Sequence, residues 1–180
     1  VLEVDSAHRT LLRRFWTSGT KQRADDGGGD LAARARLPRE VVDAGRQVWT
    51  GPVSVRISAA DWVPGGFDVG DAVTLSGWLR DLGVDLIDVS AGQTSPDSKP
   101  VYGRAFQTPF AERIRNEVGV PTMTVGNIFD HDRINTILAA GRADLVALAR
   151  AHLADPYLTL HAAAQLAPSA RSPVQYQRAA

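Results

Sequence analysis

Strands and helices alternate along most of this chain, and that alternation restricts its fold more than any other feature. Apolar, β-branched runs predict strands at residues 1–4, 53–58, 84–89, 121–125 and 143–148. Amphipathic segments predict helices at residues 38–48, 71–81, 110–118, 130–140 and 156–166. A strand-plus-helix unit of roughly 30 residues is typical of βαβ connections. The order therefore predicts an α/β protein with a parallel sheet.

Two features of the sequence distinguish a doubly wound sheet from a barrel. No glycine-rich dinucleotide fingerprint follows a predicted strand, which argues against a doubly wound sheet. A complete (β/α)8 barrel needs about 250 residues, whereas this chain has 180 and begins at Val1 inside a predicted strand. We therefore predict one domain, residues 1–180, that forms the C-terminal half of a TIM (β/α)8 barrel with about five strands, truncated at its N-terminus.

Composition removes several classes of function. Lys plus Arg and Asp plus Glu both number 20, so the formal net charge is zero and no global field favours nucleic acid or an anionic membrane. The absence of cysteine excludes disulfides and a catalytic thiol. No apolar run approaches the roughly 18 residues of a membrane span, and no signal pattern opens the chain. We expect a cytoplasmic protein that acts on a small molecule.

In a barrel the working groups lie where the strands end. The residues that occupy such positions here are Asp5, His8, Arg56, Gly126, Ala149 and Arg150. A glycine at a strand end lets an anion approach backbone N–H groups, and an arginine offers a bidentate fork. Gly126 and Arg150 therefore predict a phosphate site. The alternative is that Gly126 only makes a turn and that Arg150 pairs with Asp155.

Arg56 lies inside an otherwise apolar strand, where an unpaired charge is very costly. It predicts either a contact to an anionic cofactor or an internal ion pair with Asp88 or Glu3. The four histidines show no metal-ligand spacing, so no metal site is predicted. Another phosphate-binding barrel, such as an aldolase or epimerase, would need a lysine or metal ligands at strand ends, which we do not find.

Several segments together resemble a known family. They are VSVRISAADW at 53–62, GVDLIDVSAGQ at 83–93, KPVYGR at 99–104, GRADL at 141–145, ADP at 154–156 and PVQY at 173–176. The chain resembles the C-terminal half of Old Yellow Enzyme-type NADH:flavin oxidoreductases. It looks most like the reductase-like domain of bifunctional salicylyl-CoA 5-hydroxylase-type proteins. Residues 36–166 match well, residues 1–35 diverge, and residues 167–180 form a C-terminal tail.

The resemblance implies FMN as cofactor and NADH or NADPH as reductant. It implies hydride transfer from reduced FMN to an activated alkene or an aromatic acyl thioester in the intact parent. Arg56 falls where the family places an arginine beside flavin N1 and O2, where positive charge stabilises the anionic reduced ring. Gly126, Ala149 and Arg150 match the FMN phosphate site.

The substrate-binding positions are implied in the same way. His8 matches a residue that hydrogen-bonds the substrate carbonyl oxygen, and Asp5 stands at the other carbonyl-binding position. Arg178 matches an arginine that some members insert into a neighbouring subunit. We accordingly expect either a homo-oligomer or association with the remainder of a barrel.

Two departures from the family pattern concern catalysis. Asp5 replaces a histidine or asparagine, and a carboxylate would repel developing enolate charge. Thr10 replaces the tyrosine that protonates the α-carbon, and its hydroxyl is a far weaker acid. Two hypotheses follow: an FMN-dependent oxidoreductase domain, or a catalytically silent remnant that serves as a structural or interaction domain. Whether the chain itself is an enzyme stays open on sequence alone.

Overall fold

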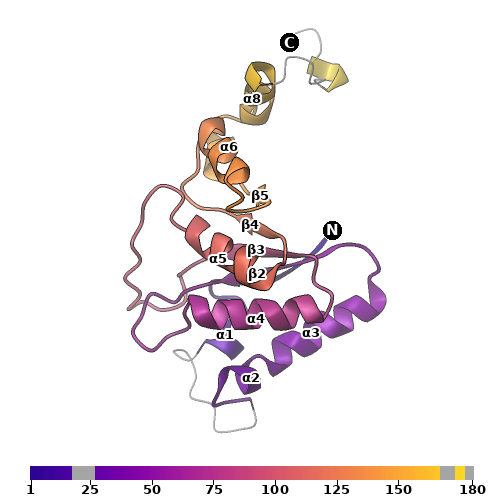
Figure 1. Cartoon of the computed structure of the whole chain (residues 1–180), viewed down its shortest axis with the longest axis vertical. Coiled ribbons are helices and arrows are strands. Elements are labelled where there is room, and N and C mark those ends of the chain that lie inside the picture. The colour runs from indigo at the N-terminus through magenta and orange to yellow at the C-terminus, as the bar shows by residue number, and fades with distance from the viewer. Residues whose placement is uncertain (18–26, 167–172, 177–180) are drawn as a thin grey trace.

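The computed structural model describes residues 1–17, 27–166 and 173–176, and they form one parallel sheet with helices around it (Figure 1). The strands follow one another across the sheet in the order β1-β2-β3-β4-β5. Their bounds are β1 Leu2–Ser6, β2 Val53–Ser58, β3 Leu86–Ser90, β4 Thr122–Thr124 and β5 Leu145–Val146. All neighbouring pairs are parallel, so every strand ends at the same edge.

The strand order distinguishes the two parallel architectures. A doubly wound sheet reverses its order at a switch point, whereas this sheet runs from β1 to β5 without a reversal. A continuous sequential order is what a segment of a (β/α)8 barrel requires. The predicted α/β fold, a partial TIM-type barrel of five strands, is confirmed. The predicted strand at residues 143–148 was too long, because pairing with β4 covers only Leu145 and Val146.

Helices fill the connections between strands. They are α1 Arg13–Trp16, α2 Leu31–Arg34, α3 Arg36–Val48, α4 Val69–Asp81, α5 Thr108–Val118, α6 His131–Ala139, α7 Arg150–Ala154 and α8 Leu158–Leu166, with a 3-10 turn η1 at Val174–Tyr176. The four helices predicted between residues 38 and 140 are confirmed. The short helices α1, α2 and α7 were not predicted, because one turn of helix is too brief for the apolar period to show.

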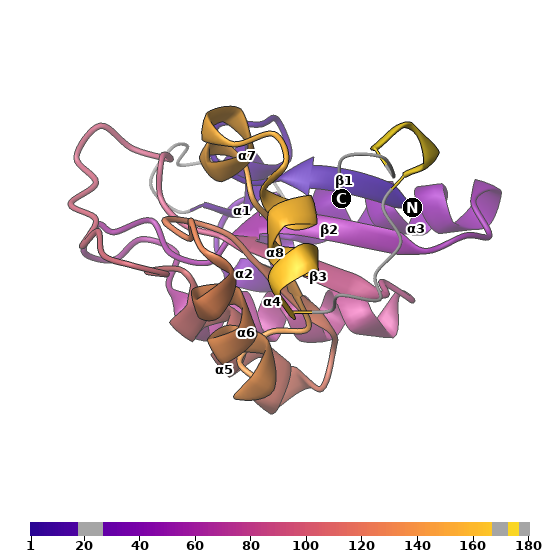
Figure 2. The ribbon, with the colours of Figure 1, turned by 90° about the horizontal axis from the view of Figure 1, so that it is seen from above.

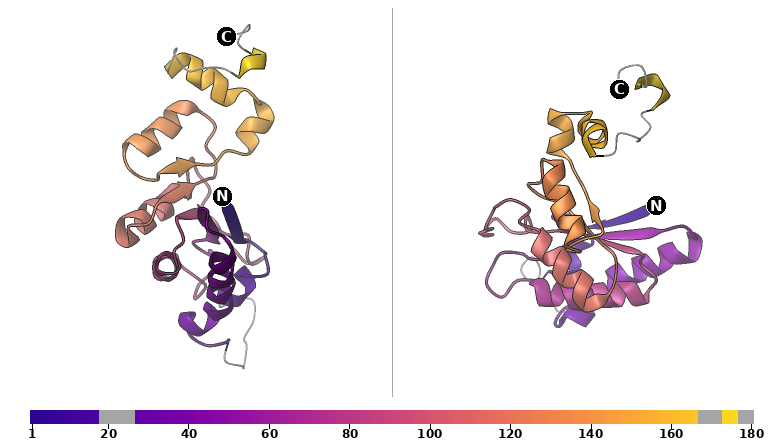
Figure 3. Two further views of the ribbon diagram at one scale, coloured as in Figure 1. Left: turned by 90° about the vertical axis from the view of Figure 1, so that its right-hand side faces the viewer. Right: turned by 45° about the horizontal axis from the view of Figure 1, so that its top comes forward.

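The main core lies between the sheet and the helices. Helices α3, α4 and α5 cover one face of the sheet, and α6, α7 and α8 continue beyond β5 (Figures 1 and 3). Val55 and Ile57 of β2 pack in a single buried cluster with Leu75 of α4 and Ile114 of α5. Each of these side chains is removed from solvent, which favours the folded chain by about 1.5–3 kcal/mol per large aliphatic side chain.

The opposite face of the sheet is polar. Side chains alternate along a strand, so the residues between the core positions point away from the helices. In register across that face lie Asp5 of β1, Arg56 of β2 and Asp88 of β3. Figure 2 looks down on this side, where β1 and β2 face the viewer. The charged residues singled out in the sequence therefore share one face of the sheet.

Within the described part of the chain, no helix has both the length and the apolar character needed to span a bilayer.

Candidate active site

His8 lies in the loop after β1, at the edge where the strands end. Its backbone has a φ of +54°, which is uncommon for a residue other than glycine. The N–H of His8 donates a 2.8 Å hydrogen bond to Oγ of Ser58, the last residue of β2. This bond fixes the loop to the neighbouring strand. The structure thus places His8 at a strand end, as the sequence predicts.

The His8 ring begins a chain of hydrogen bonds along this edge. Its Nε2 lies 2.9 Å from Ser90 Oγ, which donates over 3.0 Å to Gln107 Oε1. Gln107 Nε2 in turn donates over 2.8 Å to the carbonyl oxygen of Val125. Since the Ser90 proton is given to Gln107, Ser90 accepts from His8. The neutral His8 ring therefore carries its proton on Nε2 and presents Nδ1 as an acceptor.

The surroundings of His8 keep its ring uncharged. Burial lowers the pKa of His8 below its ordinary 6.5, and the nearby positive charges of Arg56 and Arg13 lower it further. The carboxylate of Asp5 acts in the opposite direction and raises that pKa. The lowering influences prevail, so His8 is a neutral imidazole at pH 7.

Asp5 is exposed and sits one residue before the end of β1. Its Oδ1 accepts a 3.0 Å hydrogen bond from the N–H of Ala7, which stabilises the turn leading to His8. An ionised carboxylate can only accept hydrogen bonds. Asp5 therefore acts on the site through its negative charge and through this turn.

Arg56 forms an ion pair across the sheet. Its Nε lies 3.3 Å from Asp88 Oδ2, and the two side chains are 30% and 4% exposed. The sequence left this pairing open as an alternative to a cofactor contact, and the pair with Asp88 is confirmed. Glu3, the other partner considered, instead accepts a 2.6 Å hydrogen bond from Ser54 Oγ.

The ion pair leaves hydrogen-bonding capacity on both sides. Among the described residues, neither Nε of Arg56 nor Oδ1 of Asp88 has a hydrogen-bond partner. Burial raises the pKa of Asp88 to about 6; Arg56 opposes that rise, while Glu3 and Asp5 add to it. Asp88 therefore gains or loses its proton close to neutral pH. Nε of Arg56 thus contacts Asp88 through charge alone, without a hydrogen bond.

Gly126, Ala149 and Arg150 lie together at the ends of β4 and β5. They line a small cleft of about 60 Å³, whose other walls are Val125, Asn127, Ile128, Phe129, Ala147 and Ala151. Arg150 is exposed, with its guanidinium carbon 5.8 Å from the centre of the Phe129 ring. The predicted phosphate-site residues are thus neighbours in space.

The structure decides between the alternatives for Arg150 and Gly126. Asp155 does not pair with Arg150; it lies 2.9 Å from His161 Nδ1 and accepts from the N–H of Tyr157. Gly126 is more than a turn residue. Its φ is +109°, and a Cβ there would lie 2.2 Å from Gln107 Nε2. Glycine is favoured at this position because a side chain would be strained at this φ and would displace the end of the Gln107 side chain.

The structure does not bring every predicted residue into one cavity. Arg56 lies on the open face of the sheet and is not among the residues that line the Gly126 cleft. Arg178 falls outside the described residues. Convergence of Arg56 and the cleft on a single flavin therefore stays a prediction.

Two residues in the hydrogen-bond chain at this edge were assigned no role from the sequence. Ser90 and Gln107 connect His8 to the Gly126 loop. Both are buried, and each follows or borders a predicted element. Ser90 ends β3 and Gln107 directly precedes α5, so no local signal connects them; residues 8, 90 and 107 become neighbours only through the parallel sheet.

A parallel sheet of sequential strands, with polar groups gathered at its carboxyl edge, defines a (β/α)-barrel type of enzyme scaffold. Residues 1–168 match the model of the NADH:flavin oxidoreductase / NADH oxidase family. The chain belongs to this family, whose cofactors are FMN and a nicotinamide nucleotide.

Relatives with curated descriptions agree with this assignment. The chain is 43% identical over 178 residues to an NADPH dehydrogenase of Geobacillus thermodenitrificans and 42% identical over 179 residues to one of Bacillus licheniformis. Each match covers 99% of this chain and 52% of the relative. The chain therefore spans about half the length of these relatives.

Solved structures show the same fold. A 2-naphthoyl-CoA reductase matches with a TM-score of 0.81 at 22% identity, over 91% of this chain and 26% of that one. Histamine dehydrogenase from Rhizobium sp. 4-9 matches with a TM-score of 0.73 at 26% identity, over 89% of this chain and 24% of that one.

Proposed function

We propose that this chain supplies the substrate edge and the phosphate cleft of an FMN-dependent oxidoreductase that uses NADH or NADPH. The substrate would be an activated alkene or an aromatic acyl thioester. One observation carries the proposal. The chain of hydrogen bonds from His8 through Ser90 to Gln107, called here the His8 relay, and the Gly126 cleft lie on the same carboxyl edge and are joined through Gln107. Ligand sites of barrels are built at this edge.

The residues present suit the phosphate and the ring of FMN. Gly126 and Asn127 have φ values of +109° and +56° beside Arg150, so backbone and guanidinium donors border one cleft that suits a phosphate. Arg56 lies on the polar face of the sheet with its side chain 30% exposed, where it would offer positive charge to a flavin ring. The bound flavin would supply hydride transfer.

The proposed role of His8 is to bind a substrate carbonyl oxygen. In its neutral form the ring presents Nδ1 without a proton, because Nε2 donates to Ser90. Donation to a carbonyl therefore requires a second proton, at Nδ1. The negative charge of Asp5 favours that protonation, whereas burial and Arg56 oppose it. Binding through His8 should accordingly strengthen as the pH falls.

A second candidate function is a catalytically silent structural or interaction domain. Thr10, at the position of the family's proton donor, already gives its hydroxyl proton to the carbonyl of Ala7 over 2.9 Å. Asp5 has no proton to donate when ionised. The sheet edges β1 and β5 would then pair with the remainder of a barrel or with a second copy. A cytoplasmic location stays an expectation from the sequence.

Turnover of NADPH with 2-cyclohexenone separates the two functions. The wild-type protein and the double variant Asp5→His, Thr10→Tyr are each assayed with saturating FMN. An oxidoreductase shows enone-dependent NADPH oxidation above that of free FMN, and His8→Ala removes it. If only the double variant turns over, the silent function is supported. No turnover by either protein, with circular dichroism showing intact folds and a flavin titration showing bound FMN, contradicts the proposed oxidoreductase function.

A further inference from the structure

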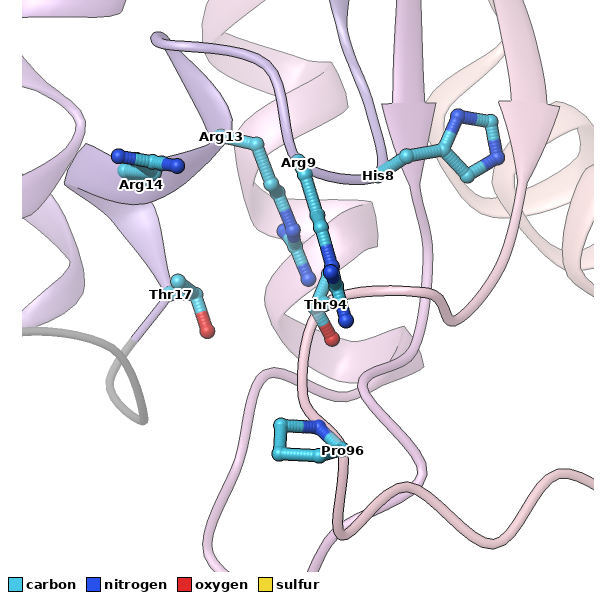
Figure 4. Close-up of a pocket in the computed structure, with 7 residues that line it drawn as sticks. All are labelled: His8, Arg9, Arg13, Arg14, Thr17, Thr94 and Pro96. Atoms are coloured by element: carbon cyan, nitrogen blue, oxygen red, sulfur yellow. The ribbon is translucent and has the colours of Figure 1, made fainter.

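A cavity of about 410 Å³ lies beside the loop that follows β1 (Figure 4). The residues that line it are His8, Arg9, Arg13, Arg14, Thr17, Thr94 and Pro96. Three of these seven side chains are arginines, and no acidic side chain appears among the described lining residues. The cavity is separate from the Gly126 cleft, with which it shares no lining residue.

Arg13 forms the rear wall of this cavity. Its side chain is 1% exposed and pairs through Nη2 with Asp61. The guanidinium carbon also stands 4.5 Å from the centre of the Phe67 ring. These two contacts hold the guanidinium in place. Its Nε and Nη1 have no hydrogen-bond partner among the described residues, which is costly for a buried charged group.

Arg9 and Arg14 add positive charge that none of the described residues neutralises. Both are exposed, and within residues 1–17, 27–166 and 173–176 neither forms an ion pair. Arg9 and Arg13 both line the cavity, and in the view of Figure 4 their side chains extend in the same direction, toward Thr94. Positive charges that line one cavity repel each other, and a bound anion reduces that repulsion. Among the described residues, only Asp61 balances one of these three charges, through its pair with Arg13.

The ring of His8 is directed away from these guanidinium groups (Figure 4). It points instead toward β3, where it meets Ser90. An anion bound by the arginines would therefore lie on the other side of the loop from the His8 ring. The cavity suits a group distant from any reacting atoms. Its volume is also far larger than a single carboxylate requires.

We propose that this cavity binds the phosphate group of a phosphorylated ligand, held by Arg9 and Arg14 with the fixed guanidinium of Arg13 behind them. Guanidinium forks match phosphate oxygens in bidentate geometry. The phosphate could be inorganic diphosphate or part of a nicotinamide dinucleotide. Only the second source depends on the proposed oxidoreductase function.

Binding is tested directly with inorganic diphosphate and the whole chain, without flavin or turnover. The measurement is the ¹H–¹⁵N NMR signals of the arginine Nε–H groups during a titration. We expect saturable shifts of the Arg9, Arg13 and Arg14 signals. Arg9→Ala and Arg14→Ala should each weaken diphosphate affinity about tenfold, as loss of a charge-assisted contact predicts. Arg133→Ala, an arginine of α6 that lines neither cavity nor cleft, should leave it unchanged.

The variants are chosen so that folding does not confuse the result. Arg9 and Arg14 are exposed, and the buried Arg13 is left intact. Arg9→Lys keeps the charge without the fork and should give an intermediate affinity. Absence of a saturable shift in the wild-type chain, or equal affinities for Arg9→Ala, Arg14→Ala and wild type, would overturn the proposal. Neither result would bear on the oxidoreductase function.

Competition then identifies the source of the phosphate. NADPH and NADH differ by one phosphate group, so both are added to the diphosphate-loaded chain. Displacement by NADPH and not by NADH supports a site for that additional phosphate. Displacement by neither supports a site for a smaller phosphorylated ligand. Displacement by both with equal affinity supports binding of the diphosphate bridge that the two dinucleotides share, and contradicts a site for the additional phosphate.

Discussion

At the scale of single residues, two buried carboxylates have opposite electrostatic roles. Asp61 accepts hydrogen bonds from Arg13, Thr17 and the N–H of Phe67. Burial alone would raise its pKa, but these partners hold the pKa below its usual value. Asp88 has one ionic partner and an orphaned oxygen, and burial raises its pKa to about 6. The ionised form of Asp61 therefore stabilises the fold, whereas the ionised form of Asp88 destabilises it.

Replacing Asp88 should change how stability depends on pH. The folded pKa of about 6 exceeds the ordinary value of 3.8, so the stabilising proton is fully present below pH 4 and is lost as the pH rises through 6. The difference corresponds to about 3 kcal/mol. Asp88→Asn should therefore gain stability relative to wild type between pH 4 and 7.5. Urea unfolding at both pH values measures the gain, with the exposed Asp97→Asn as control. If the unfolding free energies of Asp88→Asn and wild type changed equally between the two pH values, the raised pKa of Asp88 would be contradicted.

Asp61→Ala should be strongly destabilising. The substitution leaves the Arg13 guanidinium buried without its counter-ion, and losing one member of a buried pair costs about 3–5 kcal/mol. Glu117→Ala provides a matched control, because it breaks the exposed pair with Arg113 on α5, which is worth about 0.3–0.5 kcal/mol. Chemical unfolding of the two variants at pH 7 compares them. Similar losses in both would show that the buried pair contributes no more than a surface one.

At the scale of elements, local signals located the helices better than the strand ends. Asp68 and Asp71 form a capping box at the start of α4, Asp130 caps α6, and Gly119 ends α5 with φ +74°. Such features are written in a few adjacent residues and so can be predicted. Strand limits depend on partners far along the chain. The stretch after residue 149 gave two helices, α7 and α8, because Asp155 and Pro156 interrupt it.

The junction after β4 offers a test of how an element supports the site. Gly126→Ala forces a side chain into φ +109° and against Gln107 Nε2, so Gln107 must leave its place between Ser90 and Val125. We expect a loss of 1–3 kcal/mol in unfolding free energy and a changed His8 ring signal in NMR. Gly77→Ala, inside α4 with no atom near the added carbon, should stabilise by about 0.5–1 kcal/mol. An unchanged His8 signal in Gly126→Ala would separate the cleft from the relay.

At the scale of the whole molecule, the sequence predicted which residues stand at strand ends but not how they connect. Asp5, His8 and Gly126 follow from counting strands in a barrel. The hydrogen bonds of His8, Ser90 and Gln107 depend on the two crossovers between β1 and β3 and on the loop before α5, which bring residues 8, 90 and 107 together. The Arg13–Asp61 pair likewise joins residues 48 apart in sequence. Contacts of this kind follow from tertiary packing, which no local pattern encodes.

The distribution of flavin-binding groups predicts weak binding of FMN by this chain. The cleft at Gly126 measures about 60 Å³, enough for one end of the cofactor, and Arg56 stands apart from it on the polar face of the sheet. The chain also spans only about half of its relatives, so groups elsewhere in those proteins have no counterpart here. We expect a dissociation constant above micromolar in a flavin fluorescence titration.

Riboflavin, which lacks the phosphate, is the matched control for that titration. If the cleft holds phosphate through Gly126 and Arg150, FMN should bind more tightly than riboflavin, and Arg150→Ala should abolish the difference, because the guanidinium is the charged group at the cleft. Sub-micromolar affinity for FMN would show that this chain alone completes a flavin site. Equal affinities for FMN and riboflavin in the wild-type chain would instead show that the cleft does not recognise phosphate, and the assignment of residues 126, 149 and 150 would fail.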